Sequence, residues 1–100
     1  MEGHASISTD VLSRYAADAA CEVAGVRGLV ERALPARRGV RLETDGGRVR
    51  VELRLAVEWG ASIPDVGRSV QRRVREYLAR MADVETVEVD VVVDEVAPAG

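Results

Sequence analysis

Two long stretches of the chain alternate apolar and polar residues. In residues 48–58 the valines and leucines fall on one face and the arginines and glutamates on the other, and residues 84–96 repeat the pattern. Such alternation is typical of a strand with one buried face. In the second stretch it predicts four inward valines: Val87, Val89, Val91 and Val93. A shorter strand is predicted at 40–43, and the turn sequence at 44–47 joins it to 48–58 as an antiparallel hairpin.

Two other stretches repeat apolar residues at helical spacing. The first covers about residues 9–23, begins at the capping residues 8–10, and has an apolar face made mostly of alanine. The second begins near Pro64, which fits a first helical turn. Its apolar stripe consists of Ile63, Val66, Val70, Val74, Tyr77, Leu78 and Met81. For residues 25–39 the sequence predicts a connection between elements that contains a short helix, which ends at Pro35.

These elements predict an α+β fold in the order α-β-β-α-β. Each strand has one apolar face and each helix one apolar stripe. A two-layer packing buries them all, as a three-stranded mixed sheet with both helices on one face. The last strand follows a helical crossover and is expected to run parallel to the second. We expect a single domain over residues 1–100, with a core at 7–96 and frayed ends at 1–6 and 97–100.

The composition is that of a globular chain, with 47% hydrophobic and 31% charged residues among 100. No stretch is long and apolar enough to span a membrane, and the first residues lack a signal-peptide pattern, so a cytosolic location is expected. Cys21 is the only cysteine and His4 the only histidine, which leaves no metal-ligand set and no held general base. The sequence therefore predicts no catalytic residue, no metal, no cofactor and no enzyme activity.

All fourteen basic residues are arginine, and the net charge of -3 argues mildly against a dedicated nucleic-acid-binding domain. Three arginines of the second helix point directly away from its apolar stripe and form the candidate interaction face: Arg68, Arg72 and Arg75. A merely solvated helix face is the alternative interpretation. The last strand is acidic and its neighbour carries outward arginines, which predicts cross-strand ion pairs on the exposed sheet face and leaves charge for head-to-tail self-association.

Charge within the second helix is expected to be partly balanced. Asp65 lies three residues before Arg68, and Glu76 lies four residues from both Arg72 and Arg80. Side chains at these spacings are neighbours on a helix surface.

A short GXXG sequence at residues 25–28 raises an alternative, a KH-like RNA-binding module, since KH domains clamp the nucleic-acid backbone with such a loop between two helices. The segment that follows predicts only a short helix, interrupted by Pro35. Aromatic stacking platforms are also not expected, because Tyr15, Trp59 and Tyr77 fall on inward positions and are predicted to pack in the core.

Several pieces of the chain form a specific set through their order and spacing. Residues 7–11 open the first helix, AACEVAGV at 19–26 closes it, and GVRL at 39–42 starts the hairpin. The largest piece is VELRLAVEWGASIPDVGRSVQRRVREYL at 51–78, followed by VETVEVDVVV at 84–93. Together these pieces resemble the alkaline shock protein family, the envelope stress response proteins of Gram-positive and related bacteria.

The resemblance implies a small non-enzymatic protein that acts in the envelope or general stress response, through protein–protein interaction or self-association. Members of the family are linked to cell-envelope homeostasis. Some are held at the cytoplasmic membrane by a small membrane-anchored partner, and some self-associate. For this chain we therefore expect a homo-oligomer that is cytoplasmic or peripheral to the inner face of the membrane through such a partner. Direct membrane insertion is not expected.

Overall fold

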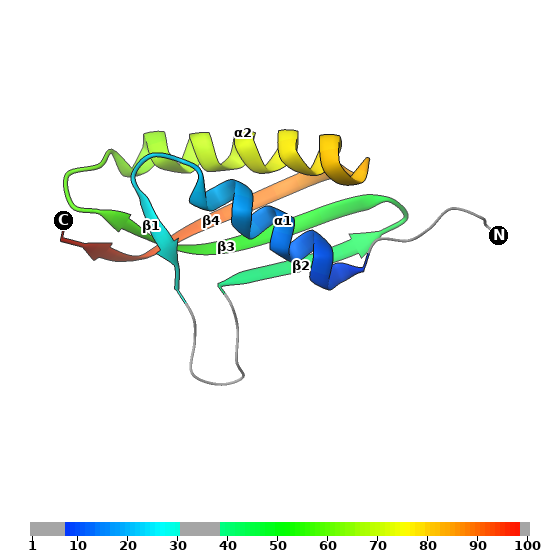
Figure 1. Cartoon of the computed structure of the whole chain (residues 1–100), viewed down its shortest axis with the longest axis horizontal. Helices are drawn as coiled ribbons and strands as arrows, with labels where there is room; N and C mark the ends of the chain where they lie inside the picture. Colours follow the sequence, from blue (N-terminus) through cyan, green and yellow to red (C-terminus); the bar gives the residue numbers. More distant parts are fainter. Residues whose placement is uncertain (1–7, 31–38, 99–100) are drawn as a thin grey trace.

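The computed structural model describes residues 8–30 and 39–98 of the chain. The elements, in order, are α1 (Thr9–Cys21), β1 (Val26–Leu29), β2 (Val40–Asp45), β3 (Arg48–Glu58), α2 (Ile63–Ala82) and β4 (Glu85–Ala97). Both helices pack on one apolar cluster and on each other, so they cover the same face of the sheet (Figure 1). The predicted α+β two-layer arrangement is confirmed, although the order is α-β-β-β-α-β and the sheet has four strands rather than three.

The long strand β3 is the centre of the sheet. Along one edge it pairs with β4 in parallel over its whole length, as predicted from the helical crossover. Along the other edge it pairs antiparallel with β2 and then with β1. Arg54 marks the junction, because its N–H donates to the carbonyl of Gly39 at 2.8 Å and its carbonyl accepts from the N–H of Val30 at 2.9 Å. The strands β1 and β2 therefore lie end to end as one flanking row that is interrupted between residues 30 and 39.

The strand β1 corrects the predicted connection with a short helix. It has only four residues, one of them Gly28, and is therefore too short and too irregular to show alternation. Leu29, expected to begin the short helix, ends this strand. The rest of that predicted helix, up to Pro35, falls at residues 31–34, which lie outside the described residues.

Gly39 holds the ends of the interruption together. Its φ of +75° lies in the left-handed region, and a Cβ atom there would come within 2.7 Å of the carbonyl oxygen of Val30 and 2.8 Å of the Cβ of Leu29. Only glycine allows both the backbone conformation and the close approach.

Serine caps and proline set where the helices begin. The Oγ of Ser8 accepts from the N–H of Val11 at 3.2 Å, and the Oγ of Ser62 accepts from the N–H of Asp65 at 3.4 Å. Pro64 lies in the first turn of α2, as predicted. Both caps satisfy backbone donors that have no partner inside the helix.

The core is built by the inward side chains of β3, the alanine face of α1 and the apolar stripe of α2. Tyr15 and Tyr77 pack edge to face, with ring centroids 5.8 Å apart, where the two helices meet. Trp59 was expected beside them, but it is 74% exposed, because β3 ends at Glu58 and the chain turns away there. Other predicted stripe members also remain partly exposed at the helix ends: Ile63 and Met81.

Two irregularities in β4 change which side chains face the core. Its pairing with β3 shifts at Val87 and again at Asp94, each as a one-residue bulge. As a result Thr86 is buried and Val87 lines a hollow on the outer face, so the prediction of an inward Val87 is wrong. Val89 is buried as predicted. The predicted frayed end at 97–100 is corrected at Ala97, which ends β4 and accepts from the N–H of Trp59.

Candidate functional site

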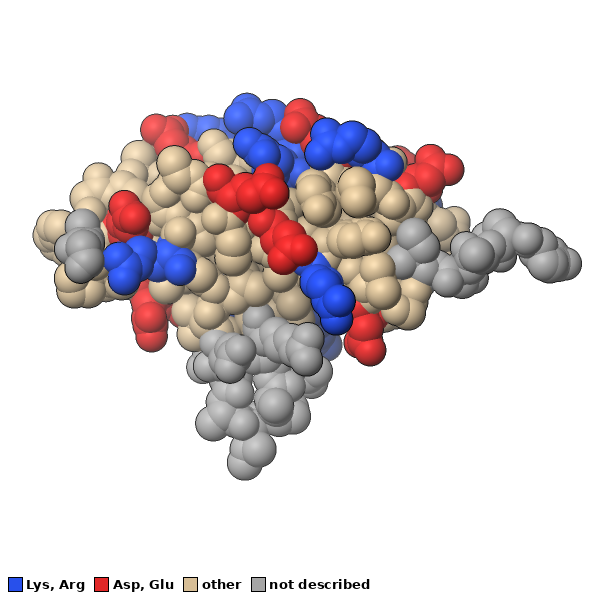
Figure 2. All heavy atoms as spheres, viewed as in Figure 1, with Lys and Arg blue, Asp and Glu red and all other residues tan. Residues whose placement is uncertain are grey.

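The helix α2 presents the candidate interaction face to solvent. Its buried residues are Val66, Val70, Val74 and Leu78, and the arginines of the candidate face lie on the opposite side. All three are exposed: Arg68, Arg72 and Arg75. In the space-filling view, basic side chains form a band along α2, and acidic side chains lie beside it over α1 (Figure 2).

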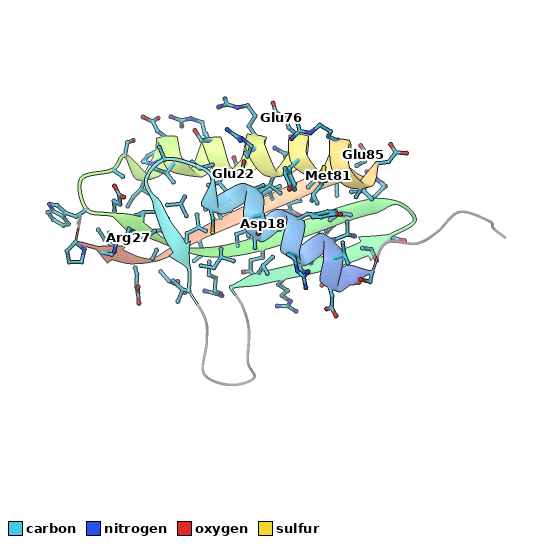
Figure 3. All side chains as sticks on the ribbon, viewed as in Figure 1. Asp18, Glu22, Arg27, Glu76, Met81 and Glu85 are labelled. Carbon is cyan, nitrogen blue, oxygen red and sulfur yellow. The ribbon has the colours of Figure 1, made fainter. Side chains whose placement is uncertain are left out.

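These three arginines differ in what they contact. Arg68 pairs with Asp65 as predicted, but both side chains are 70% exposed, so the pair contributes well under about 1 kcal/mol. Arg75 donates its Nε to the carbonyl of Thr86 at 3.4 Å. Arg72 has no ion pair in the described part of the chain. The predicted pairing of Glu76 with Arg72 is not formed there, and Glu76 points outward from α2 (Figure 3).

The flank of α2 that faces α1 is tied to the rest of the molecule. Arg73 donates its Nη1 to a carboxylate oxygen of Glu22, the C-cap residue of α1, at 2.8 Å. The guanidinium of Arg80 lies over the ring of Tyr77, 5.7 Å from its centroid, where a cation–π interaction is favourable. Arginines of this flank are therefore engaged in contacts within the chain, whereas Arg68 and Arg72 face solvent.

The flank of α2 that faces β4 holds a contact that the sequence did not reveal. The Nε2 of Gln71 donates to the carbonyl of Val89 at 2.9 Å, beside the bond from Arg75 to Thr86. In the sequence, Gln71 stands out only as part of the stretch 51–78 that resembles the family. An uncharged polar residue at the border of an apolar stripe was the available signal for a side chain that reaches a strand edge.

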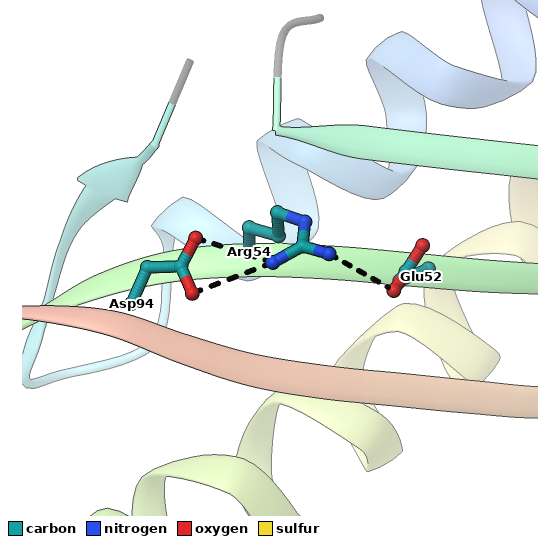
Figure 4. A network of polar contacts seen from close by, with 3 residues as sticks. All are labelled: Glu52, Arg54 and Asp94. Carbon is teal, nitrogen blue, oxygen red and sulfur yellow. Dashed lines mark hydrogen bonds and ion pairs between the residues drawn. The ribbon is translucent and has the colours of Figure 1, made fainter. Parts of the chain in front are cut away.

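Three arginines on the outer face of the sheet have ion pairs with carboxylates, as predicted, whereas Arg41 has none in the described part of the chain. Arg48 pairs with Glu85 at 3.7 Å, and Arg50 pairs with Glu88 at 3.8 Å. Arg54 lies between Asp94 at 3.3 Å and Glu52 at 3.7 Å (Figure 4). The strand register places these opposite charges side by side, so the sheet face neutralises much of its own charge.

Hollows on this outer face have charged walls. One is lined by Arg41, Glu43, Arg50, Val51, Glu52, Glu88 and Asp90. Small-molecule sites are mostly apolar with a few placed polar groups, and this lining differs from that composition. In residues 8–30 and 39–98, no group of three or more His, Cys, Asp or Glu residues could hold a metal ion. No helix within those ranges is long and apolar enough to cross a membrane.

The free thiol of Cys21 lies at the end of α1. Partial burial, and then the negative charge of Asp18, raise the pKa of the Cys21 thiol above its ordinary value. Because the thiolate is the nucleophilic form, a raised pKa leaves this thiol less reactive at neutral pH.

The GXXG sequence at 25–28 does not form a loop between two helices. Gly25 lies in the turn after α1, and Val26 to Gly28 are paired with β3 in the sheet. Arg27, the exposed residue of this stretch, donates to the carbonyl of Pro98 at 3.2 Å. The geometry of the KH clamp, in which the loop joins two helices, is therefore not present in this segment.

Comparison with known proteins gives a family and a fold. A family model described as alkaline shock protein 23 family, cell envelope-related function, matches residues 1–98, which confirms the resemblance inferred from the sequence. No curated protein matches the chain.

Similar solved structures include forms of MamM CTD. A manganese form has a TM-score of 0.67 and 18% identity over 88% of this chain and 99% of that one. A cadmium form has a TM-score of 0.66 and 16% identity over 90% and 100%. Identity this low shows a shared fold alone.

Proposed function

The chain belongs to the alkaline shock protein 23 family, which has a cell envelope-related function, and from this membership we propose that it is a non-enzymatic envelope or general stress response protein. In this proposal it acts through protein–protein interaction or self-association near the cytoplasmic membrane. It is cytoplasmic, forms homo-oligomers, and reaches the inner face of the membrane through a small membrane-anchored partner. It does not insert into the membrane itself.

The observation that carries the proposal is the contrast between the two arginine-bearing surfaces. On the sheet, Arg48, Arg50 and Arg54 each have a carboxylate of the same chain within 4 Å. On α2, Arg72 has no such carboxylate among the described residues, and Arg68 has one that is about as exposed as the Glu85 partner of Arg48. Arginine is enriched in protein interfaces because its planar guanidinium forms paired hydrogen bonds with carboxylates. The face on α2 therefore suits an acidic protein surface.

Self-association can use the same face. The outer face of the sheet carries acidic side chains that have no ion pair in the described part of the chain, among them Glu43 and Asp90. A second copy can therefore offer carboxylates to Arg68 and Arg72. Charge complementarity of this kind sets orientation and association rate more than it sets affinity.

The test reverses charge on the face and leaves the rest of the molecule unchanged. In the double variant Arg68→Glu with Arg72→Glu, the bond from Arg75 to Thr86 is kept. We expect at least a tenfold loss of the membrane-fraction partner that co-purifies with the tagged protein, or loss of the oligomer. Mass spectrometry of the purified material measures the first, and size-exclusion chromatography with light scattering measures the second.

A matched control has the same change in net charge at two exposed positions outside α2 and outside the hollow that holds Glu43 and Asp90, Arg14→Glu with Arg27→Glu. This control should behave like the wild type. Equal losses in both double variants, or no loss in either, would contradict a role for the face on α2. Salt-sensitive binding of mixed RNA to the wild type, lost in Arg27→Glu, would favour the RNA-binding alternative instead.

A further inference from the structure

The outer edge of β4 is capped by side chains of α2 in its first half. Its carbonyls at Thr86 and Val89 accept from the side chains of Arg75 and Gln71. Both carbonyls point away from β3, which pairs with the opposite edge of β4. Uncapped edge strands present free N–H and C=O groups that template pairing with another chain, and caps of this kind block such pairing.

Beyond Val89 the same edge is uncapped. The pairing of β4 with β3 is regular from Val89 to Val93, so Val91 and Val93 direct their backbone groups to the same side as Val89. In the described part of the chain, no side chain bonds to these outward groups of Val91 and Val93. The bulge at Asp94 ends the regular stretch. An open edge of about four residues, 90–93, therefore remains, long enough for a short paired strand.

One arginine of the candidate interaction face, Arg68, lies toward this open edge. Gln71 contacts Val89 and Arg75 contacts Thr86, so α2 and β4 run in opposite directions. Arg68 is one helical turn before Gln71 and is therefore placed toward Val91. On the other side of the sheet, Asp90 and Glu88 lie at the same level of β4. A strand added here would meet Arg68 on the helix side of the sheet, and Glu88 and Asp90 on the outer side.

We propose that the edge of β4 beyond Val89, up to Val93, pairs with an extended segment of a partner protein whose carboxylates face Arg68. The inference rests on the proposed function and names the chemistry of its partner. Main-chain hydrogen bonds supply affinity in such strand addition, and alternate side chains supply specificity. The segment carries carboxylates at every second position, and uncharged or basic residues at the positions beside Asp90.

A second copy of the chain is not the occupant of this edge. Pairing of two β4 edges would bring the arginines of both α2 helices to the same junction. Like charges that face each other across an interface are unfavourable. The proposed homo-oligomers of the chain therefore use other surfaces than this edge.

The experiment measures hydrogen exchange of individual amides in the wild-type chain by NMR. The probe is an acetylated, amidated peptide of four Thr-Glu repeats, and the control probe replaces glutamate by lysine. We expect the Thr-Glu peptide to slow exchange of the Val91 and Val93 amides at least tenfold. Thr44, on the opposite edge of the sheet, points its N–H away from β3 and is the internal control. Its exchange should not change.

A proline variant tests the same pairing by affinity. Val91→Pro removes an outward N–H that has no partner within the described chain, and proline is tolerated at such edge positions. Its Kd for the Thr-Glu peptide, measured by calorimetry, should rise at least tenfold, while Thr44→Pro leaves the Kd unchanged. Circular dichroism checks that both variants are folded. If Val91→Pro does not fold, the exchange measurement on the wild type decides.

Two outcomes overturn the inference. One is the lack of binding of the Thr-Glu peptide up to about 1 mM, which corresponds to about 4 kcal/mol of binding free energy. The other is binding without protection of the Val91 and Val93 amides, or with equal affinity for the lysine peptide. Either result leaves the proposed function standing if Arg68→Glu with Arg72→Glu still releases the co-purifying partner. Failure of that double variant counts against the proposed function itself.

Discussion

The strands on the two sides of β3 differ in how they follow its length: β4 lies on one side, and β1 and β2 form a row on the other. Both must follow an eleven-residue strand, and neither does so without an irregularity. On one side β4 is continuous, and it absorbs two extra residues as bulges at Val87 and Asp94. On the other side the row is divided into β1 and β2, with an interruption between residues 30 and 39. A bulge changes the direction of side chains within a strand, whereas the interruption needs a close contact where Val30 and Gly39 meet.

Both irregularities meet at Arg54. Its backbone N–H and C=O bond to Gly39 and Val30, the two residues on either side of the interruption. Its side chain bonds to Asp94, the residue of the second bulge (Figure 4). One position on the central strand therefore joins the interrupted row to the bulged one.

The largest effect is expected where the interrupted row closes. In Gly39→Ala the new Cβ would lie 2.7 Å from a backbone oxygen, at a φ of +75°. The left-handed conformation and the clash together should lower the free energy of unfolding by about 2–4 kcal/mol. Urea denaturation followed by far-UV circular dichroism measures this. The signal of Trp59 is less suited, because its side chain is already 74% exposed in the folded state.

A matched control is Gly67→Ala, in the second turn of α2. Gly67 does not have a positive φ, and a Cβ there meets no atom within 4 Å. Alanine is the better helix former, so this variant should gain about 0.5–1 kcal/mol. A loss below about 1 kcal/mol for Gly39→Ala would show that Gly39 and Val30 can move apart without destabilising the sheet.

A smaller effect is expected at the position that joins the two rows. Arg54→Met keeps the backbone bonds to β1 and β2 and removes the cation between Glu52 and Asp94. The side chains of Arg54 and Asp94 are only 32% and 19% exposed, so the free energy of unfolding should fall by about 1 kcal/mol. Urea denaturation at two salt concentrations measures the loss and its screening.

The comparison variant for this ion pair is Arg48→Met, at the exposed start of β3. Arg48 and Glu85 are 64% and 71% exposed and 3.7 Å apart, so its loss should be at most about 0.5 kcal/mol. Equal losses for the two variants would mean that the half-buried pair at Arg54 contributes no more than an exposed one. The link between the two rows would then depend on the backbone alone.

The sequence predicted the regular parts of this fold and missed its irregular ones, for a physical reason. Alternation over residues 48–58 identified β3 with its observed bounds, since a long half-buried strand repeats one signal many times. Four residues with a glycine cannot repeat it, so β1 was missed. A one-residue bulge reverses the inward and outward faces beyond it, which is why Val87 was placed inward. Local patterns do not encode where a partner strand forces such a shift.

The candidate site was predicted in part. Helical spacing placed Arg68, Arg72 and Arg75 on the outward side of α2, because that spacing depends only on the helix itself. What lies beside them depends on tertiary packing. The contact of Gln71 with Val89, and the open edge beyond it, follow from how α2 crosses β4. Trp59 was placed in the core because its strand was extended by one residue too many.

The last comparison concerns the two threonines that pair with Val49 of β3, Thr44 on β2 and Thr86 on β4. Thr44 of β2 is exposed, whereas the first bulge of β4 leaves Thr86 buried, with its hydroxyl lacking a hydrogen-bond partner in the described structure. A buried hydroxyl without a partner is costly, and valine has nearly the same shape. Thr86→Val should therefore raise the free energy of unfolding by about 1 kcal/mol in urea denaturation, and Thr44→Val should change it by less than about 0.5 kcal/mol. A loss of stability in Thr86→Val would mean that the Thr86 hydroxyl forms a hydrogen bond in solution. The bulged strand β4 would then bury no hydroxyl without a partner at this level of the sheet.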